Sequence, residues 1–219
     1  MLGRQRPQAQ ELRRRAGIDR EQVFVLATPL DDYAIFVWDT SDIHRAIEVL
    51  ATDGGESSCW FEHHLQDAHG LDVVGASTFR VPELLGEWKS PTWQFDAFEG
   101  SGLCFPIAEG NLQAGHDFVS AVMVGGSHHA DFVATRAAFG IVRQMFFHLQ
   151  TPNGVLAIMY GEGRNGWFED AFAGTVTGNQ PFFEWWRDQV TSIAAVPQFT
   201  RTTPPTVDQV FHMSTTVPA

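Results

Sequence analysis

Cysteine, lysine and long apolar runs are scarce in this sequence. Only two cysteines, Cys59 and Cys104, occur among the 219 residues, too few for the disulfide framework of a small secreted domain. No stretch reaches the roughly 18 apolar residues of a membrane-spanning helix, and the first residues hold no apolar segment of the secretory type. We therefore expect a protein that is not secreted by a signal peptide and has no membrane partner, located in the cytoplasm or within an assembled particle.

Positive charge is also scarce, except near the first residue. Lys89 is the only lysine, and the formal net charge is −12. Residues 1–20 differ, because they carry six arginines against Glu11 and Asp19, a net charge of +4. The acidic remainder argues against nucleic acid as a partner. The basic stretch is interpreted either as an ordinary first helix or as an arm that docks on the acidic surface of another copy.

Hydrophobic residues are plentiful enough to form a core. They make up 44% of the chain and include 18 Phe and 7 Trp. Two β-rich runs, 23–28 and 33–38, predict a hairpin, and the apolar positions of 43–50 share one helical face. The expected organisation is a basic N-terminal arm or helix over 1–20, a single α+β domain over 21–196 and an extended Thr- and Pro-rich C-terminal arm over 197–219.

Residues 117–150 are the stretch from which the fold is predicted. The apolar run 118–124 is typical of a strand covered on both faces. Gly125-Gly126 predicts a turn, and Ser127 can cap a following helix. Apolar residues then recur at helical spacing over 130–150: Phe132, Phe139, Val142, Phe146 and Leu149. The predicted fold is therefore α+β, with a mixed or antiparallel sheet packed against one long amphipathic helix (130–150), smaller helices and an extended C-terminal arm.

Residues 161–166 read GEGRNG and fit the pattern G-x-G-x-x-G. They follow an apolar run, 155–160, that predicts a strand, and they precede an expected helix. Such glycines let a backbone approach a phosphate or a ribose closely. About 25 residues from this run through TVTGNQ resemble the first motif of some S-adenosylmethionine-dependent methyltransferases, which implies a cofactor site at Gly161, Gly163 and Gly166. A tight turn between two elements is the alternative interpretation, and the cofactor stays unknown.

Cys59 is the candidate nucleophile. Its position near the start of an expected helix would lower the pKa of the thiol. The Cys-Trp pair at 59–60 resembles the nucleophile of papain-like and transglutaminase-like enzymes, which implies a histidine base and an orienting acid or amide. His116, His128 and His129 are candidates for the base, and Asp131 is a candidate for the orienting group. The alternative interpretation is a small buried side chain.

Histidine clusters raise the question of a metal site. His63, His64 and His69 lie on one expected helix with Asp67, and two histidines with a carboxylate can bind a transition metal. No strong spacing such as H-E-x-x-H occurs, and adjacent histidines on a helix point in different directions. No metal is therefore predicted, and capping, surface or core roles are expected.

Residues 182–186 contain four large aromatic side chains, which cannot all point inward from one helix. Part of this set predicts an interface or a pocket. Our leading hypothesis is a non-enzymatic structural or interaction subunit of a larger assembly, such as a virion or similar particle. Its self-association or protein partners would use residues 1–20, 182–186 and 197–219.

Two other functions remain open. The element order over 103–149 resembles the closing half of GAF-type sensor domains, which implies a small-molecule-binding domain with a pocket over the sheet. The remaining alternative is a thiol enzyme that uses Cys59 with a histidine base.

Overall fold

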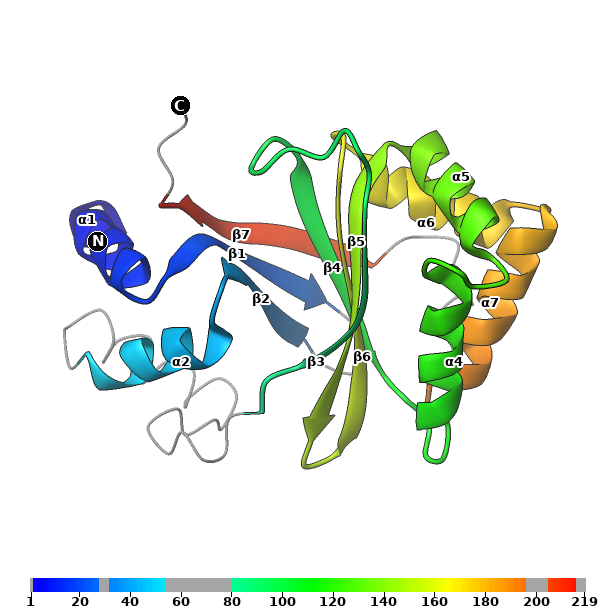
Figure 1. The fold of residues 1–219 in the computed structure, drawn as a ribbon, viewed down its shortest axis with the longest axis horizontal. Coiled ribbons are helices and arrows are strands. Elements are labelled where there is room, and N and C mark those ends of the chain that lie inside the picture. The colour runs from blue at the N-terminus through cyan, green and yellow to red at the C-terminus, as the bar shows by residue number, and fades with distance from the viewer. Residues whose placement is uncertain (1, 28–31, 54–79, 196–204, 216–219) are drawn as a thin grey trace. The chain divides into compact units, whose positions relative to one another are not determined.

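Two antiparallel sheets organise the residues that the computed structural model describes, namely 2–27, 32–53, 80–195 and 205–215 (Figure 1). The strand order is β2-β1-β7 in the three-stranded sheet and β3-β5-β6-β4 in the four-stranded sheet. The strands are β1 Ile18–Ala27, β2 Asp32–Thr40, β3 Glu83–Lys89, β4 Glu99–Pro106, β5 Ile141–Thr151, β6 Gly154–Gly163 and β7 Thr206–Ser214.

Six helices accompany the sheets in the described part of the chain. They are α1 Leu2–Arg15, α2 Ile43–Thr52, α4 Leu112–Val122, α5 His129–Phe139, α6 Trp167–Thr177 and α7 Pro181–Ile193. The α+β prediction is confirmed. None of these described helices is long and apolar enough to cross a membrane.

The chain divides into two compact units, each built from separated stretches. The first unit comprises residues 1–23, 36–81 and 210–219, and the second comprises 24–35 and 82–209. Strands β1, β2 and β7 therefore each contribute residues to both units.

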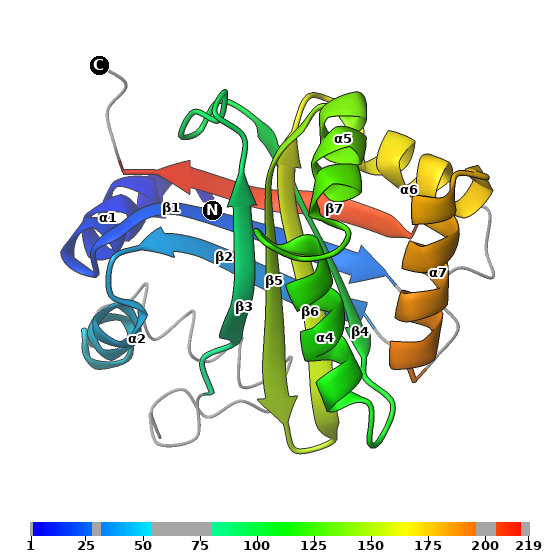
Figure 2. The same cartoon turned by 45° about the vertical axis from the view of Figure 1, so that its right-hand side comes forward.

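In the second unit, α4, α5 and α7 cover one face of the four-stranded sheet (Figures 1 and 2). Phe146 of β5 pairs in register with Met159 of β6 and contributes to the core on this face. Trp186 of α7 is the centre of the aromatic packing. Its ring lies 4.8 Å from Phe118, 6.2 Å from Phe132 and 6.4 Å from Phe146, measured between centroids.

In the first unit, α1 and α2 share a small apolar core. Leu12 and Ala16 pack against Ala46 and Leu50 together with Ile18. The four arginines of residues 1–20 whose side chains are described form ion pairs within this unit: Arg13 with Glu21, Arg14 with Glu11, Arg15 with Asp53 and Arg20 with Asp39. Arg13, Arg14 and Arg15 of α1 and Arg20 of β1 therefore pair with acids of their own unit.

The single long helix predicted over 130–150 is wrong. α5 ends at Phe139, Gly140 adopts a left-handed φ of 70°, and β5 begins at Ile141. A spacing of four residues, such as that between Val142 and Phe146, returns to the same face of a strand as well as of a helix. The apolar pattern was therefore compatible with both elements, and the glycine separates them.

The strand predicted over 118–124 is wrong as well, since most of this run lies in α4. Phe118, Val119 and Val122 are buried, while Asp117 and Ser120 are exposed, which is the spacing of one helical face. The glycine turn after it is confirmed. A Cβ at Gly126 would lie 2.3 Å from two backbone oxygens, so the turn admits no side chain there.

Candidate functional site

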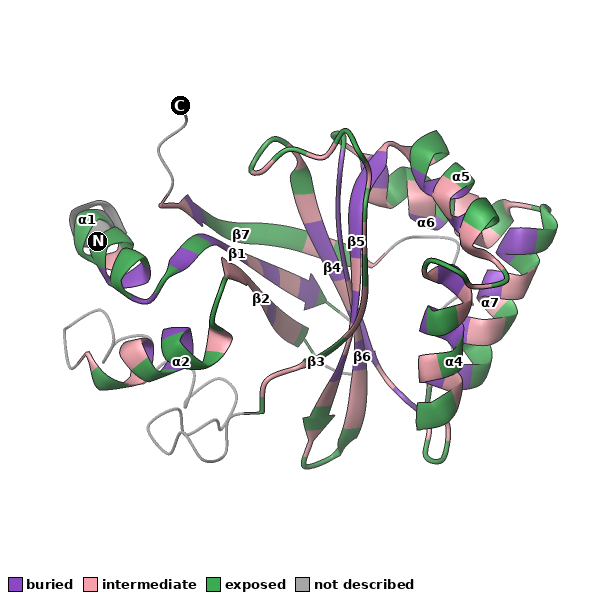
Figure 3. Ribbon diagram, in the orientation of Figure 1, coloured by how far each residue is buried: buried purple, intermediate pink, exposed green. Residues whose placement is uncertain are grey.

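The outer edge of β7 carries a run of exposed residues. This strand ends the β2-β1-β7 sheet, so only β1 pairs with it among the described residues. Five consecutive residues, 208–212, are exposed. Because successive side chains of a strand point to opposite faces, both faces are open over this length (Figure 3).

Apolar side chains lie in this open stretch. Val210 is 58% exposed and Phe211 is 38% exposed. Natural edge strands are usually protected from pairing by lysine, proline or a bulge. The sequence of β7, TVDQVFHMS, contains no lysine and no proline. The described edge thus has the features of a strand that can accept another strand.

The candidate catalytic residues do not form a catalytic arrangement in the part of the chain that can be described. Cys59 lies outside it, as do His63, His64, Asp67 and His69. His128 is the N-cap residue of α5, and its ring stacks 3.9 Å from that of Trp185. His129 Nδ1 lies 2.9 Å from the carbonyl oxygen of Val122.

The other residues considered lie at the start of α5 or in the core. Asp131 is exposed in the first turn of α5, where a carboxylate is favoured by the helix dipole. The expected cap Ser127 is replaced in that role by His128, which makes no side-chain capping bond. The other cysteine, Cys104, is buried, and burial raises the pKa of its thiol to about 12. It therefore stays protonated and is a poor nucleophile.

The glycine motif is divided between β6 and α6. Gly161 and Gly163 are strand residues, and Gly166 is the N-cap of α6 with a φ of 75°. A Cβ at Gly161 would lie 2.7 Å from Trp167 Cη2, and one at Gly163 would lie 2.6 Å from Trp167 Cγ. The first two glycines therefore make room for an indole ring.

Glu162, between these glycines, is the centre of a buried polar cluster that the sequence did not reveal. Its side chain is fully buried. Oε1 accepts hydrogen bonds from Arg143 at 2.9 Å and from the Tyr160 hydroxyl at 3.1 Å, and Oε2 accepts one from Trp93 Nε1 at 2.8 Å. Arg143 also donates to Glu87 at 2.8 Å. Both carboxylate oxygens are thus satisfied by the protein itself.

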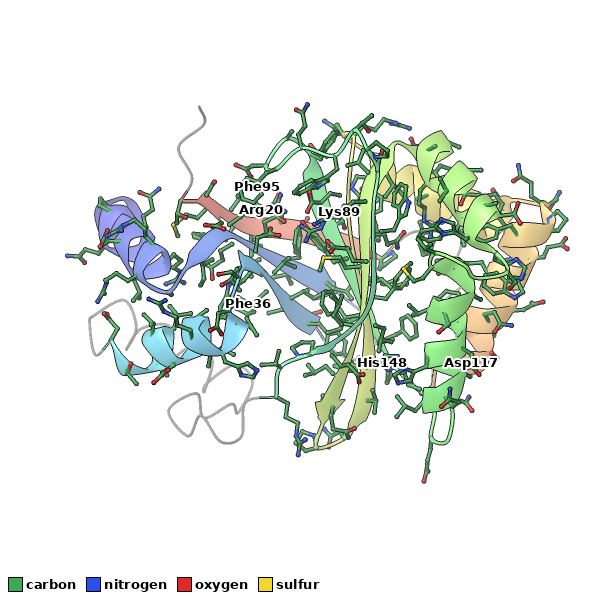
Figure 4. All side chains as sticks on the ribbon, in the orientation of Figure 1. Arg20, Phe36, Lys89, Phe95, Asp117 and His148 are labelled. Atoms are coloured by element: carbon green, nitrogen blue, oxygen red, sulfur yellow. The ribbon has the colours of Figure 1, made fainter. Side chains whose placement is uncertain are left out.

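The buried His148 and the partly exposed His116 form a second polar feature. Their rings meet edge to face at 4.9 Å between centroids, and His148 is only 7% exposed. A Cβ at Gly115 would lie 2.9 Å from the His148 ring, so the glycine permits this approach. Burial, followed by the proximity of His116, lowers the pKa of His148, and Glu83 acts in the opposite direction. Figure 4 labels His148 on the sheet and Asp117 on α4, the helix that also carries His116.

Arg136 is a buried cation held by aromatic rings. Its guanidinium carbon lies 4.3 Å from the Phe132 ring centroid and 4.4 Å from that of Trp186. Its Nε donates to Gln144 at 2.6 Å. Burial lowers the pKa of Arg136 to about 9, so the group remains charged at neutral pH. In the aromatic stretch 182–186, Phe182, Phe183 and Trp186 are buried in the core, whereas Trp185 is partly exposed.

Known proteins add no assignment to these features. Comparison of the chain with protein-family models, with curated proteins and with solved structures found no match. Among the described residues, no group of three His, Cys, Asp or Glu side chains could hold a metal ion. The functional argument therefore rests on the open strand and on the clusters described above.

Proposed function

We propose that the chain is a non-enzymatic structural subunit that assembles with a second copy of itself through the outer edge of β7. The observation that carries this proposal is the run of five exposed residues on the terminal strand of the sheet. An open strand offers backbone N–H and C=O groups to another strand. Pairing would place Val210 and Phe211 in contact with protein rather than with water.

The sequence of β7 favours another β7 as the partner. In a two-fold antiparallel pair centred on Val210, residues at equal distances on either side face each other across the interface. Asp208 then lies opposite His212 of the other copy, which sets an acid against an imidazole. Gln209 lies opposite Phe211, and Val210 lies opposite its own equivalent. Cross-strand pairs of opposite charge stabilise such an arrangement.

The expected association is concentration-dependent rather than permanent. Each new backbone hydrogen bond contributes about 1 kcal/mol net, and a two-strand contact alone covers less than the roughly 1,200 Å² of a stable interface. The dimer should therefore dissociate on dilution. Larger assembly would need additional surfaces, for which residues 1–20, 182–186 and 197–219 remain the predicted candidates.

Sedimentation velocity over a wide concentration range tests the proposal with the substitution Val210→Lys. In the proposed register two lysines would face each other, and like charges directly opposite are unfavourable. We expect the unsubstituted chain to shift toward a dimer as concentration rises and the variant to remain a monomer.

Val124→Lys is the matched control. Val124 is 87% exposed and lies between α4 and α5, so it introduces the same charge away from β7. It should associate like the unsubstituted chain. A chain that stays monomeric at every concentration, or a Val210→Lys variant that dimerises equally well, contradicts the proposal.

A further inference from the structure

Two Asn-Gly pairs occur in the sequence, and both lie in turns of the second unit. Asn165-Gly166 joins β6 to α6 at the end of the glycine motif, and Asn153-Gly154 lies at the tip of the β5–β6 hairpin. Both asparagines are exposed. An asparagine before a glycine is chemically labile, because glycine has no Cβ to hinder the approach of its nitrogen to the preceding side chain.

The groups that would react at Asn165 are free of hydrogen bonds to the described residues. Neither the side-chain amide of Asn165 nor the backbone N–H of Gly166 has a partner in that part of the chain. Gly166 uses only its carbonyl oxygen, which accepts from the Asp170 N–H at 3.3 Å. The nitrogen of Gly166 can therefore react without first breaking a bond within the fold.

Positive charge surrounds the same peptide group. Arg164 donates from Nη1 to the carbonyl oxygen of Asn165 at 3.3 Å, and Asp170 holds the guanidinium from the other side at 2.5 Å. This carbonyl is bonded to the nitrogen of Gly166, so the arginine makes the Gly166 N–H more acidic. The start of α6 adds the positive end of the helix dipole. Both charges stabilise an anion that forms at this turn.

The other pair, Asn153-Gly154, lies in a more constrained turn without a basic group. Gly154 pairs with Thr151 in the strand register. Thr151 Oγ1 accepts from the Asn153 N–H at 3.2 Å and donates to the Gly154 carbonyl oxygen at 2.8 Å. The turn Thr151-Pro152-Asn153-Gly154 contains no Arg or Lys. It therefore resists the backbone rotation that ring closure needs, and no arginine assists the reaction.

We propose that Asn165 is a site of spontaneous deamidation and that it reacts faster in the folded chain than Asn153. The Gly166 nitrogen loses its proton to hydroxide and attacks Cγ of Asn165. A cyclic succinimide forms as the bond from Cγ to the amide nitrogen breaks, and that nitrogen takes a proton from water and leaves as ammonia. Water then opens the ring at either carbonyl and gives aspartate or isoaspartate.

The modification would change the start of α6. A new carboxylate would lie where the helix dipole favours negative charge, and isoaspartate would also lengthen the backbone between β6 and α6 by a methylene group. This site is independent of the association proposed for β7.

Peptide mapping by mass spectrometry tests the inference on the folded chain after incubation at mildly alkaline pH. Digestion with pepsin in acid keeps further deamidation slow during the measurement. We expect Asn165 to deamidate roughly three- to tenfold faster than Asn153 in the folded chain. In concentrated urea the two sites should react at similar rates. Equal rates in the folded chain, or a faster reaction at Asn153, overturn the proposal.

Variants at two positions identify the site and the cause. Asn165→Gln should abolish the reaction in this peptide, because the longer side chain closes a ring far less readily, and should leave Asn153 unchanged. Arg164→Gln keeps the Cγ and Cδ atoms that lie over Gly140 and should slow Asn165 alone. Arg164→Lys should keep most of the rate.

Salt separates the charge of Arg164 from a structural role. Because salt screens exposed charges, added salt should slow Asn165 in the unsubstituted chain and have less effect in Arg164→Gln. An unchanged rate at Asn165 in Arg164→Gln overturns the assignment of the arginine. Equal slowing of Asn165 in Arg164→Gln and Arg164→Lys, without a change in salt dependence, does so as well.

Discussion

At the scale of single residues, His148 links the stability of the second unit to pH. Its pKa is lowered in the fold by burial and by His116, so the folded chain binds a proton less readily than the unfolded chain. The contribution to stability is complete above the unfolded pKa of about 6.5 and is lost as pH falls through the lower folded value. We predict that the urea midpoint decreases as pH falls below about 6.5. In the His148→Gln variant, the midpoint should depend less steeply on pH.

The informative quantity is the slope of the urea midpoint against pH, not the midpoint at any one pH. A buried substitution at His148 can shift stability at every pH because the ring packs closely on Gly115. His44→Gln, at an exposed position of α2, controls for loss of a histidine in general and should keep the original slope. If His148→Gln shows the same acid dependence as the unsubstituted chain, the buried histidine is not the cause.

At the scale of elements, Glu162 connects segments that are distant in the sequence. Its carboxylate on β6 accepts from Arg143 of β5 and from Trp93, which follows β3. Tyr160 adds a third donor. Glu162→Gln removes the negative charge. It also replaces one carboxylate oxygen, a hydrogen-bond acceptor, by an amide NH2 group, which then faces another donor. Because it removes one partner of a buried ion pair, we predict a loss of about 2–5 kcal/mol in unfolding free energy, measured by urea titration.

Glu109→Gln supplies the comparison for this substitution. Glu109 is exposed, and the same chemical change there should alter stability by no more than about 0.5 kcal/mol. A Glu162→Gln variant as stable as Glu109→Gln would mean that the cluster contributes little to the fold.

Two elements were predictable from the sequence, one by the helical spacing of its apolar residues and one by its short apolar run. The helix at 43–50 and the strand at 155–160 are confirmed as α2 and β6. The stretch 130–150 was not predictable, because a four-residue spacing fits both the helical and the strand period. The structure assigns the change of element to Gly140, whose left-handed φ ends α5. The predicted helix had passed through this glycine.

The clusters could not be predicted, because their members are far apart along the chain. Trp93 lies 69 residues from Glu162, and Glu87 lies 56 residues from Arg143. The strand register brings Glu87, Arg143 and Glu162 together, and Trp93 reaches Glu162 from the loop that follows β3. The sequence did single out Gly161 and Gly163, but for a phosphate-binding turn. Their contact with Trp167 depends on where α6 returns to the sheet.

At the scale of the whole molecule, the open edge of β7 depends on strand order. The composition of residues 197–219 predicted an extended arm, and residues 206–214 do form a strand. That this strand ends the sheet follows only from the order β2-β1-β7. A two-fold contact would cover one edge in each copy and close on itself, which favours a dimer over an open fibre.

The register of this dimer can be tested by exchanging charges. Asp208→Lys places a lysine opposite His212 of the other copy, and His212→Glu places a glutamate opposite Asp208. Each change acts twice in a symmetric dimer, so each should weaken association roughly threefold to thirtyfold. The double variant sets the new lysine of one copy against the new glutamate of the other and should restore the original dissociation constant in sedimentation equilibrium.

The matched control is Asp208→Lys combined with Gln209→Glu. It also introduces one new lysine and one new glutamate, but residue 209 faces Phe211 in the proposed register. Association should therefore stay weak. A register shifted by one residue would set position 208 against Phe211 or Met213, and the first double variant would then fail to recover. Recovery in the first double variant without recovery in the second thus identifies Val210 as the centre of the pair.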